Sequence, residues 1–164
     1  MEGISSLTPR SLNPAIDIGQ IEGAFVQGQG WSTIEEPLIS PTSGSLLTRG
    51  PGTLCLIGLG MYKIPGFKDI PQDFRVKIVK GSRNVRAIHS SKAVGEPPLF
   101  LGASVYFAIR ESVKAARLEN GVTGHFRFDC PATSERIRVH CNDEMSQNCV
   151  TILKPGEKEW GCPA

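Results

Sequence analysis

The residues with the clearest capacity for chemistry are Gly95-Glu96-Pro97-Pro98. A single carboxylate here stands between a glycine and a proline pair, and the apolar run Leu99–Leu101 follows it. Because proline suits the first turn of a helix, the pattern predicts Glu96 at a helix N-terminus beside a buried element. A carboxylate in that place could act as a general base. It could equally be an ordinary acidic residue that complements the helix dipole.

Gln20 is the second candidate, in the helical stretch that precedes Gly28. An amide side chain both donates and accepts hydrogen bonds, so it can bind the polar edge of a heterocycle. The alternative is a buried amide that satisfies backbone groups of its own protein.

The helix that must position Gln20 is predicted over Pro14 to about Gly28. Asn13-Pro14 supplies a helix cap followed by proline in the first turn, and apolar residues recur at helical spacing along the stretch. Gly28-Gln29-Gly30 is expected to end the helix. Gly19 and Gly23 lie one turn apart, and each costs about 1 kcal/mol relative to alanine. Close packing or the approach of a ligand is the expected reason for them.

The helix that must position Glu96 is predicted over Pro98 to Asn120. Its apolar residues follow one face, its first half is expected to be buried and its second half amphipathic; the residues of that face are Leu101, Val105, Ile109, Val113 and Ala116. A last helix is predicted from Thr133, a good N-cap, and is expected to carry Ile137, Cys141 and Met145 inward.

The remaining chain predicts little regular structure. Phe74–Ile78 alternates apolar and basic residues, which is typical of a half-buried strand, and Val85–His89 is its expected partner. Ser40–Gly44 predicts a turn. Met1–Arg10 shows no periodicity and is expected to be a loose end.

Composition excludes several function classes. The 164 residues carry a net charge of +2, which is too balanced to indicate a nucleic-acid or anionic-membrane partner. No apolar stretch reaches the length of about 20 residues that a membrane span needs. Five irregularly spaced cysteines predict reduced thiols in a cytoplasmic protein. Neither they nor the three histidines have the spacing of a structural zinc site, so no metal ligand is predicted.

Two stretches resemble the xanthine dehydrogenase/oxidase family of molybdenum hydroxylases: residues 90–101, SSKAVGEPPLFL, and residues 13–28, NPAIDIGQIEGAFVQG. The resemblance implies that Glu96 is the catalytic base, which removes a proton from a molybdenum-bound hydroxide during the hydroxylation of hypoxanthine and xanthine to urate. It implies that Gln20 contacts the molybdopterin and that Gly95 allows close approach to the metal.

The resemblance also has a departure from the family pattern. The stretches TRGP at 48–51 and YKIP at 62–65 also resemble family motifs. In the family these two motifs lie almost together, whereas here LCLIGLGM at 54–61 separates them. Taken alone, this insert suggests a dinucleotide-binding loop, but its third glycine is absent and Pro65 stands where a helix should run. We therefore interpret residues 54–61 as an atypical insert that changes the local geometry, including any role of Arg49.

The implied fold is an α+β, truncated C-terminal part of the molybdopterin-binding domain over residues 12–153. Residues 1–11 form a non-matching end and residues 154–164 an irregular tail. In the full-length family enzyme, a homodimer, FAD and 2Fe–2S clusters bind outside this segment, and the isolated chain is expected to be inactive. Two alternatives remain at this stage: a truncated non-catalytic product or interaction module, and a fragment of an aldehyde oxidase.

Overall fold

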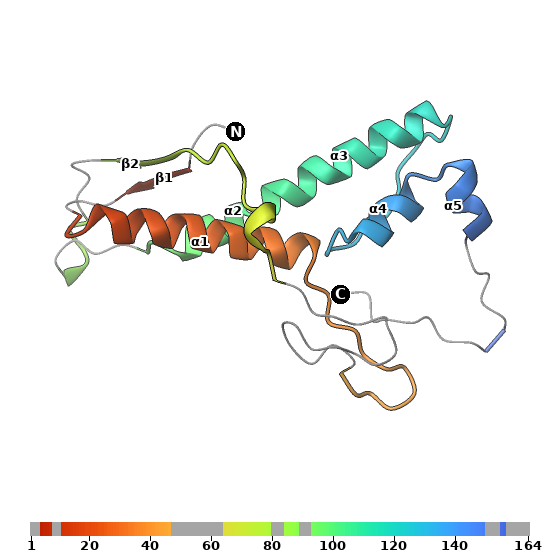
Figure 1. The fold of residues 1–164 in the computed structure, drawn as a ribbon, viewed down its shortest axis with the longest axis horizontal. Helices are drawn as coiled ribbons and strands as arrows, with labels where there is room; N and C mark the ends of the chain where they lie inside the picture. Colours follow the sequence, from red (N-terminus) through yellow and green to blue (C-terminus); the bar gives the residue numbers. More distant parts are fainter. Residues whose placement is uncertain are drawn as a thin grey trace. The chain divides into compact units, whose positions relative to one another are not determined.

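The computed structural model describes residues 11–46, 64–79, 84–88, 93–149 and 155–156, and the backbone of 4–7. The insert at 54–61, Arg49, His89 and most of the predicted tail lie outside the described residues. The chain divides into two compact units, the first within Met1–Gly30 and Pro65–Ser104 and the second within Trp31–Ile64 and Val105–Ala164. The described part is mainly helical with one short sheet, which makes it a mixed segment (Figure 1).

Helix α1, the longest element, spans Pro14–Thr33. Its start is as predicted, because the Asn13 side chain accepts a hydrogen bond from the Ala15 backbone N–H at 3.1 Å. Ile21 and Phe25 lie on its buried face. The predicted end at Gly28 is wrong, since the helix continues for more than a turn beyond it.

The reason lies in the crossing of α1 with α2, a short helix over Glu96–Leu101. A Cβ atom on Gly28 would overlap the carbonyl oxygen of Leu99, and one on Gly102 would lie 2.6 Å from the Gln29 nitrogen. Both glycines therefore serve the close approach of two backbones. Gly28 allows two helices to cross and does not terminate one.

The long helix predicted from Pro98 to Asn120 is two helices. α2 ends at Leu101, Gly102 interrupts, and α3 spans Ala103–Glu119. The predicted burial of the first half is also wrong within the described chain, because Phe100 is 77% exposed and Phe107 is 60% exposed. The amphipathic second half is confirmed, with Val113 buried on one side.

The sheet differs from the expected pairing. Strand β2, Val76–Val79, agrees with the predicted strand and alternates half-buried and exposed residues. Its partner is β1, Ile4–Leu7, which runs parallel to it with Ile4 opposite Val76 (Figure 1). The predicted loose end therefore contains a strand. The expected partner at 85–88 instead forms a turn, in which the Asn84 side chain accepts from the Arg86 N–H.

The second unit has an aromatic core. Val113, Phe128 and Ala132 are buried, and the half-buried residues packed against them are Tyr106, Ile109, Phe126, Ile137 and Cys141. The Tyr106 hydroxyl donates a hydrogen bond to the Phe128 carbonyl.

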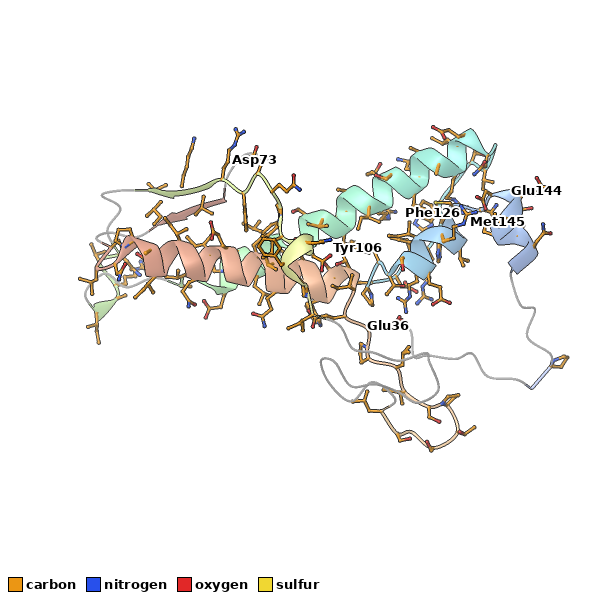
Figure 2. All side chains as sticks on the ribbon, viewed as in Figure 1. Glu36, Asp73, Tyr106, Phe126, Glu144 and Met145 are labelled. Atoms are coloured by element: carbon orange, nitrogen blue, oxygen red, sulfur yellow. The ribbon has the colours of Figure 1, made fainter. Side chains whose placement is uncertain are left out.

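Two short helices close this core, α4 at Ser134–His140 and α5 at Glu144–Cys149. Thr133 caps α4 as predicted, accepting from the Arg136 N–H. The single inward helix that we expected is wrong beyond Cys141, because Asn142 takes a positive φ of 56° and starts a new direction. Met145 is consequently 64% exposed on α5 (Figure 2).

The predicted turn at Ser40–Gly44 is confirmed. Gly44 has a φ of 68°, and its N–H donates to the Ser40 carbonyl at 2.9 Å. An isolated antiparallel bridge joins Ile39 and Leu46 on either side of it. A short 3-10 helix, η1 at Phe67–Asp69, precedes β2 in the first unit.

Candidate functional site

The first unit contains a partly open cavity of about 530 Å³. That volume falls in the usual range for small-molecule sites, about 300–1,000 Å³. Helix α1 and the start of α2 line it, with Gly19, Gln20, Gly23, Ala24, Gln27, Gly95, Glu96 and Leu99. The three residues singled out in the sequence, Gln20, Gly95 and Glu96, therefore meet at one cavity.

The α1 wall is a stripe along one face of the helix, because residues spaced by three, four and seven positions lie above one another. Gly19 and Gly23 belong to it, and a Cβ atom on either would meet nothing within 4 Å. Close packing inside the described chain is therefore not the reason for these two glycines. They leave the helix backbone open to whatever occupies the cavity.

The second wall is the start of α2. Leu99 is fixed by the crossing with Gly28, and the Leu99 N–H donates to the Gly95 carbonyl at 3.1 Å to open the helix. Glu96 follows Gly95 directly, so its backbone is held by the same turn. Its side chain is exposed, and no described residue forms a hydrogen bond or ion pair with it. The burial that we expected beside Glu96 is not supplied by this part of the chain.

Gly95 is not required by its own conformation. Its φ of −87° and ψ of −39° suit any residue. A Cβ atom there would lie 3.9 Å from the Ala24 Cβ, an ordinary contact. Neither backbone strain nor contact with the described neighbours explains this glycine. The physical reason that is left is the approach of a ligand to its backbone from the cavity side.

Two amides project along the α1 wall. The side chains of Gln20 and Gln27 are exposed to the cavity, and neither has a partner among the residues described. Gln29, on the same helix, differs because its amide nitrogen donates to the Asp69 carbonyl at 2.8 Å. Gln27 was missed in the sequence, although its seven-residue spacing from Gln20 could have placed it on the same face.

Other nucleophilic or metal-binding groups do not gather. Within the described ranges, no three His, Cys, Asp or Glu side chains form a cluster that could hold a metal ion. Desolvation raises the pKa of the Cys130 thiol, whose sulfur donates to the Ser32 carbonyl at 3.6 Å. That thiol is therefore protonated at neutral pH and a poor nucleophile. None of the described helices is long and apolar enough to span a bilayer.

The cavity offers a defined set of polar groups. The helix backbone is open at Gly19 and Gly23, which leaves room for a flat molecule, and the two amides offer both donors and acceptors to a polar edge. The exposed carboxylate of Glu96 lies on the other wall and is free to accept a proton. The arrangement can thus bind a flat polar heterocycle and carry out proton transfer beside it.

Comparison with known proteins agrees with this geometry. Residues 9–71 match the family described as the molybdopterin cofactor-binding domain. The chain is 60% identical to a xanthine dehydrogenase of Dictyostelium discoideum over 135 residues, which is 82% of this chain and 9% of the relative. It is 55% identical to a xanthine dehydrogenase/oxidase of Gallus gallus over 154 residues, which is 94% of this chain and 11% of the relative.

A plant relative gives the same result. Xanthine dehydrogenase 1 of Arabidopsis thaliana is 55% identical over 136 residues, or 83% of this chain and 10% of the relative. The chain thus spans about a tenth of the length of the curated relatives that it matches. Gln20 lies within the range matched by the domain family, whereas Glu96 lies beyond it.

Proposed function

Because the chain belongs to the xanthine dehydrogenase family as a segment of its molybdopterin-binding domain, we propose that it forms one wall of the molybdenum-cofactor site of a purine hydroxylase. Glu96 is the general base of that site and Gln20 a contact to the pterin. The single observation that carries the proposal is the common cavity of Gln20, Gly95 and Glu96.

The residues present fit the cofactor. The open backbone at Gly19 and Gly23 would leave room for the pterin, and the Gln20 amide would hold its polar edge. Gly95 leaves room for the group beside Glu96. When bound, the molybdenum cofactor supplies the oxygen-transfer and electron-accepting chemistry.

Glu96 has the features that a base requires. Its carboxylate projects into the cavity from a backbone fixed by the α1–α2 crossing, and no described residue competes for its oxygens. A carboxylate oxygen of Glu96 accepts the proton released as the carbon–oxygen bond to the substrate forms. Such a positioned base contributes roughly 100- to 10,000-fold to the rate.

The substrate class follows from the names of the relatives, which are xanthine dehydrogenases. We propose hypoxanthine and xanthine as substrates and urate as the product, with water as the source of the oxygen. The FAD and 2Fe–2S clusters of the full-length enzyme bind outside this segment. We also propose that the full-length enzyme is a cytoplasmic homodimer.

The test replaces the Glu96 carboxylate by an isosteric amide in the full-length enzyme that carries this segment. Glu96→Gln keeps the size of the side chain and removes the proton acceptor. We expect xanthine turnover to fall by roughly 100- to 10,000-fold, while the molybdenum content per protein, measured by mass spectrometry, is unchanged.

The matched control is Glu119→Gln at the exposed end of α3, which should leave both quantities unchanged. Turnover of Glu96→Gln within about threefold of the unaltered enzyme would contradict the role of Glu96 as the base. If Glu96→Gln loses both its molybdenum and its turnover, the result would instead indicate that Glu96 holds the cofactor.

A further inference from the structure

Gln27 shares with Gln20 the properties that make the latter a cofactor contact. Both line the same cavity, both are exposed, and neither forms a hydrogen bond with a described residue. They lie seven positions apart, which is about two helical turns or roughly 10 Å along the axis. Their side chains therefore project on one face at two separate levels of the cavity.

The two levels are not equally held. Gln27 precedes Gly28, whose backbone touches Leu99 of α2, and Gly102 packs on the same turn of α1. Ala24 lies one turn before Gly28 and faces Gly95. Gln20 lies one turn closer to the N-terminus of α1 than Ala24. Gln27 thus stands where the two helices are clamped together. The backbone of Gln27 is therefore fixed, so a bound ligand needs to order its side chain alone.

Gln29 shows what a structural glutamine looks like on this helix. Its side chain reaches the Asp69 carbonyl at 2.8 Å and ties α1 to η1. Gln27 has no such role in the described chain. A glutamine side chain loses rotamer freedom when a ligand orders it. A ligand with polar groups at both ends can offset this loss at both glutamines, because it forms a hydrogen bond with each.

We propose that Gln27 is the second amide that holds the cofactor, binding the end of the molybdopterin nearest to the α1–α2 crossing while Gln20 binds the other end. The inference rests on the proposed function. A pterin that carries a phosphate side chain has hydrogen-bonding groups along its whole length and suits two amides two turns apart. Gln27 is a binding residue and takes no part in proton transfer.

The experiment measures how firmly the cofactor is held. Gln27→Leu is introduced into the full-length enzyme that carries this segment, and molybdenum per protein is followed during dialysis in dilute urea. The fluorescence of the released, oxidised pterin gives a second measure. Loss of one hydrogen bond is expected to speed cofactor release by about fivefold to tenfold.

Three comparisons make the result specific. Gln27→Glu keeps the acceptor and the length but removes the donor, so it should release the cofactor at a rate different from Gln27→Leu. Gln72→Leu alters an exposed glutamine outside the cavity lining and should release it at the unaltered rate. Gln20→Leu tests the other end of the site.

The outcomes separate the two proposals. If Gln20→Leu speeds release and Gln27→Leu matches Gln72→Leu, the role of Gln27 is wrong and the proposed function stands. If neither cavity variant differs from Gln72→Leu, the α1 face is not the cofactor wall and the proposed function also fails. Faster release in both cavity variants, with unchanged thermal stability of the protein, supports the inference.

Discussion

The two units of the chain differ in where their polar side chains lie. In the second unit several of them pair with one another around an aromatic core, whereas in the first unit three of them face an open cavity without a partner among the described residues. Both have helices of ordinary sequence, so helix propensity does not explain the difference. The contrast agrees with our proposal that the first unit supplies the wall of the cofactor site.

In the second unit almost every long side chain near the core has a defined neighbour. The Arg117 guanidinium stacks over the Phe126 ring at 4.6 Å and donates to the His140 carbonyl at 2.9 Å. Arg136 pairs with Glu36 at 2.5 Å across a large sequence separation. These contacts form without any outside group, although the Nη1 atom of Arg136 is buried without a hydrogen-bond partner in the described chain.

In the first unit the cavity residues lack such neighbours. Gln20, Gln27 and Glu96 have no partner in the described part of the chain, and Gly19 and Gly23 face open space. The crossing at Gly28 is, by contrast, so close that no side chain fits. The first unit therefore combines a tight anchor at Gly28 with an unfilled surface that begins beside it at Gln27 and extends along the same helix to Gly19.

The largest effect is expected from the second unit. Phe128→Ala removes a buried ring that stacks with Tyr106 at a centroid distance of 5.7 Å. Truncation of a buried phenylalanine costs about 3–5 kcal/mol. Urea unfolding of the full chain, followed by circular dichroism, should show that loss in the free energy of unfolding.

Phe107→Ala is the matched control, since Phe107 is a mainly exposed phenylalanine on α3. It should change the free energy of unfolding by less than about 1 kcal/mol. Equal losses for Phe107 and Phe128 would contradict the self-contained core of the second unit.

The next effect concerns the anchor of the first unit. Gly28→Ala places a methyl group against the Leu99 carbonyl, so the two helices must separate. Overpacking of this kind costs about 1–3 kcal/mol, and more where only backbone can yield. We expect a lower free energy of unfolding in urea and weaker retention of molybdenum in the full-length enzyme. Unchanged stability would mean that the crossing is looser than described.

Gly23→Ala should act in the opposite direction on stability. The added methyl group meets nothing within 4 Å, and alanine is about 1 kcal/mol more favourable than glycine inside a helix. The free energy of unfolding of the apoprotein should therefore rise by up to that amount. Molybdenum retention should fall, because the methyl group would occupy the space in which we propose that the cofactor binds.

A variant that is more stable and holds more cofactor would contradict this use of Gly23. The pair Gly23→Ala and Gly28→Ala thus separates two glycines on one helix, five residues apart, by the sign of their effect on stability. Helix propensity alone predicts no such reversal, since both are the same substitution in the same helix.

Local patterns predicted the elements well where the cause was local. The Asn13 cap, the Thr133 cap, the turn at Ser40–Gly44 and the alternation of β2 are all set by residues within a few positions of one another. The sequence motifs around Gln20 and Glu96 also indicated the family, as the comparisons confirm.

The errors came from contacts that are distant in sequence. Gly28 was interpreted as a helix stop because its partner, Leu99, is far along the chain. The strand at residues 4–7 has no amphipathic pattern of its own and is defined by its pairing with β2. Phe100 is apolar yet exposed, since no described residue covers it.

The smallest predicted effect is a pH dependence at the start of α5. The Asp143 carboxylate accepts a hydrogen bond from the Ser146 N–H at 2.8 Å and pairs with Arg138 at 2.7 Å. The hydrogen bond from the Ser146 backbone is the main cause that holds the pKa of Asp143 below its ordinary value of 3.8, and the charge of Arg138 acts in the same direction. Since the unfolded chain binds the proton more tightly, ionised Asp143 stabilises the folded state above that ordinary value. The contribution is lost as the pH falls through the lower folded pKa.

Asp143→Asn should therefore lower stability slightly at neutral pH and change it little in strong acid. The measurement is the urea midpoint of the chain at pH 7 and at about pH 3, compared between the variant and the unaltered protein. Asp73→Asn is the control, because Asp73 pairs with Arg75 in the first unit, where both side chains are highly exposed (Figure 2) and such pairs contribute little. Urea midpoints of Asp143→Asn and the unaltered protein that differ by the same amount at both pH values would show that the carboxylate charge does not stabilise the start of α5. If the difference becomes smaller at low pH for Asp143→Asn alone, the ionised Asp143 carboxylate contributes this small electrostatic stabilisation to the second unit.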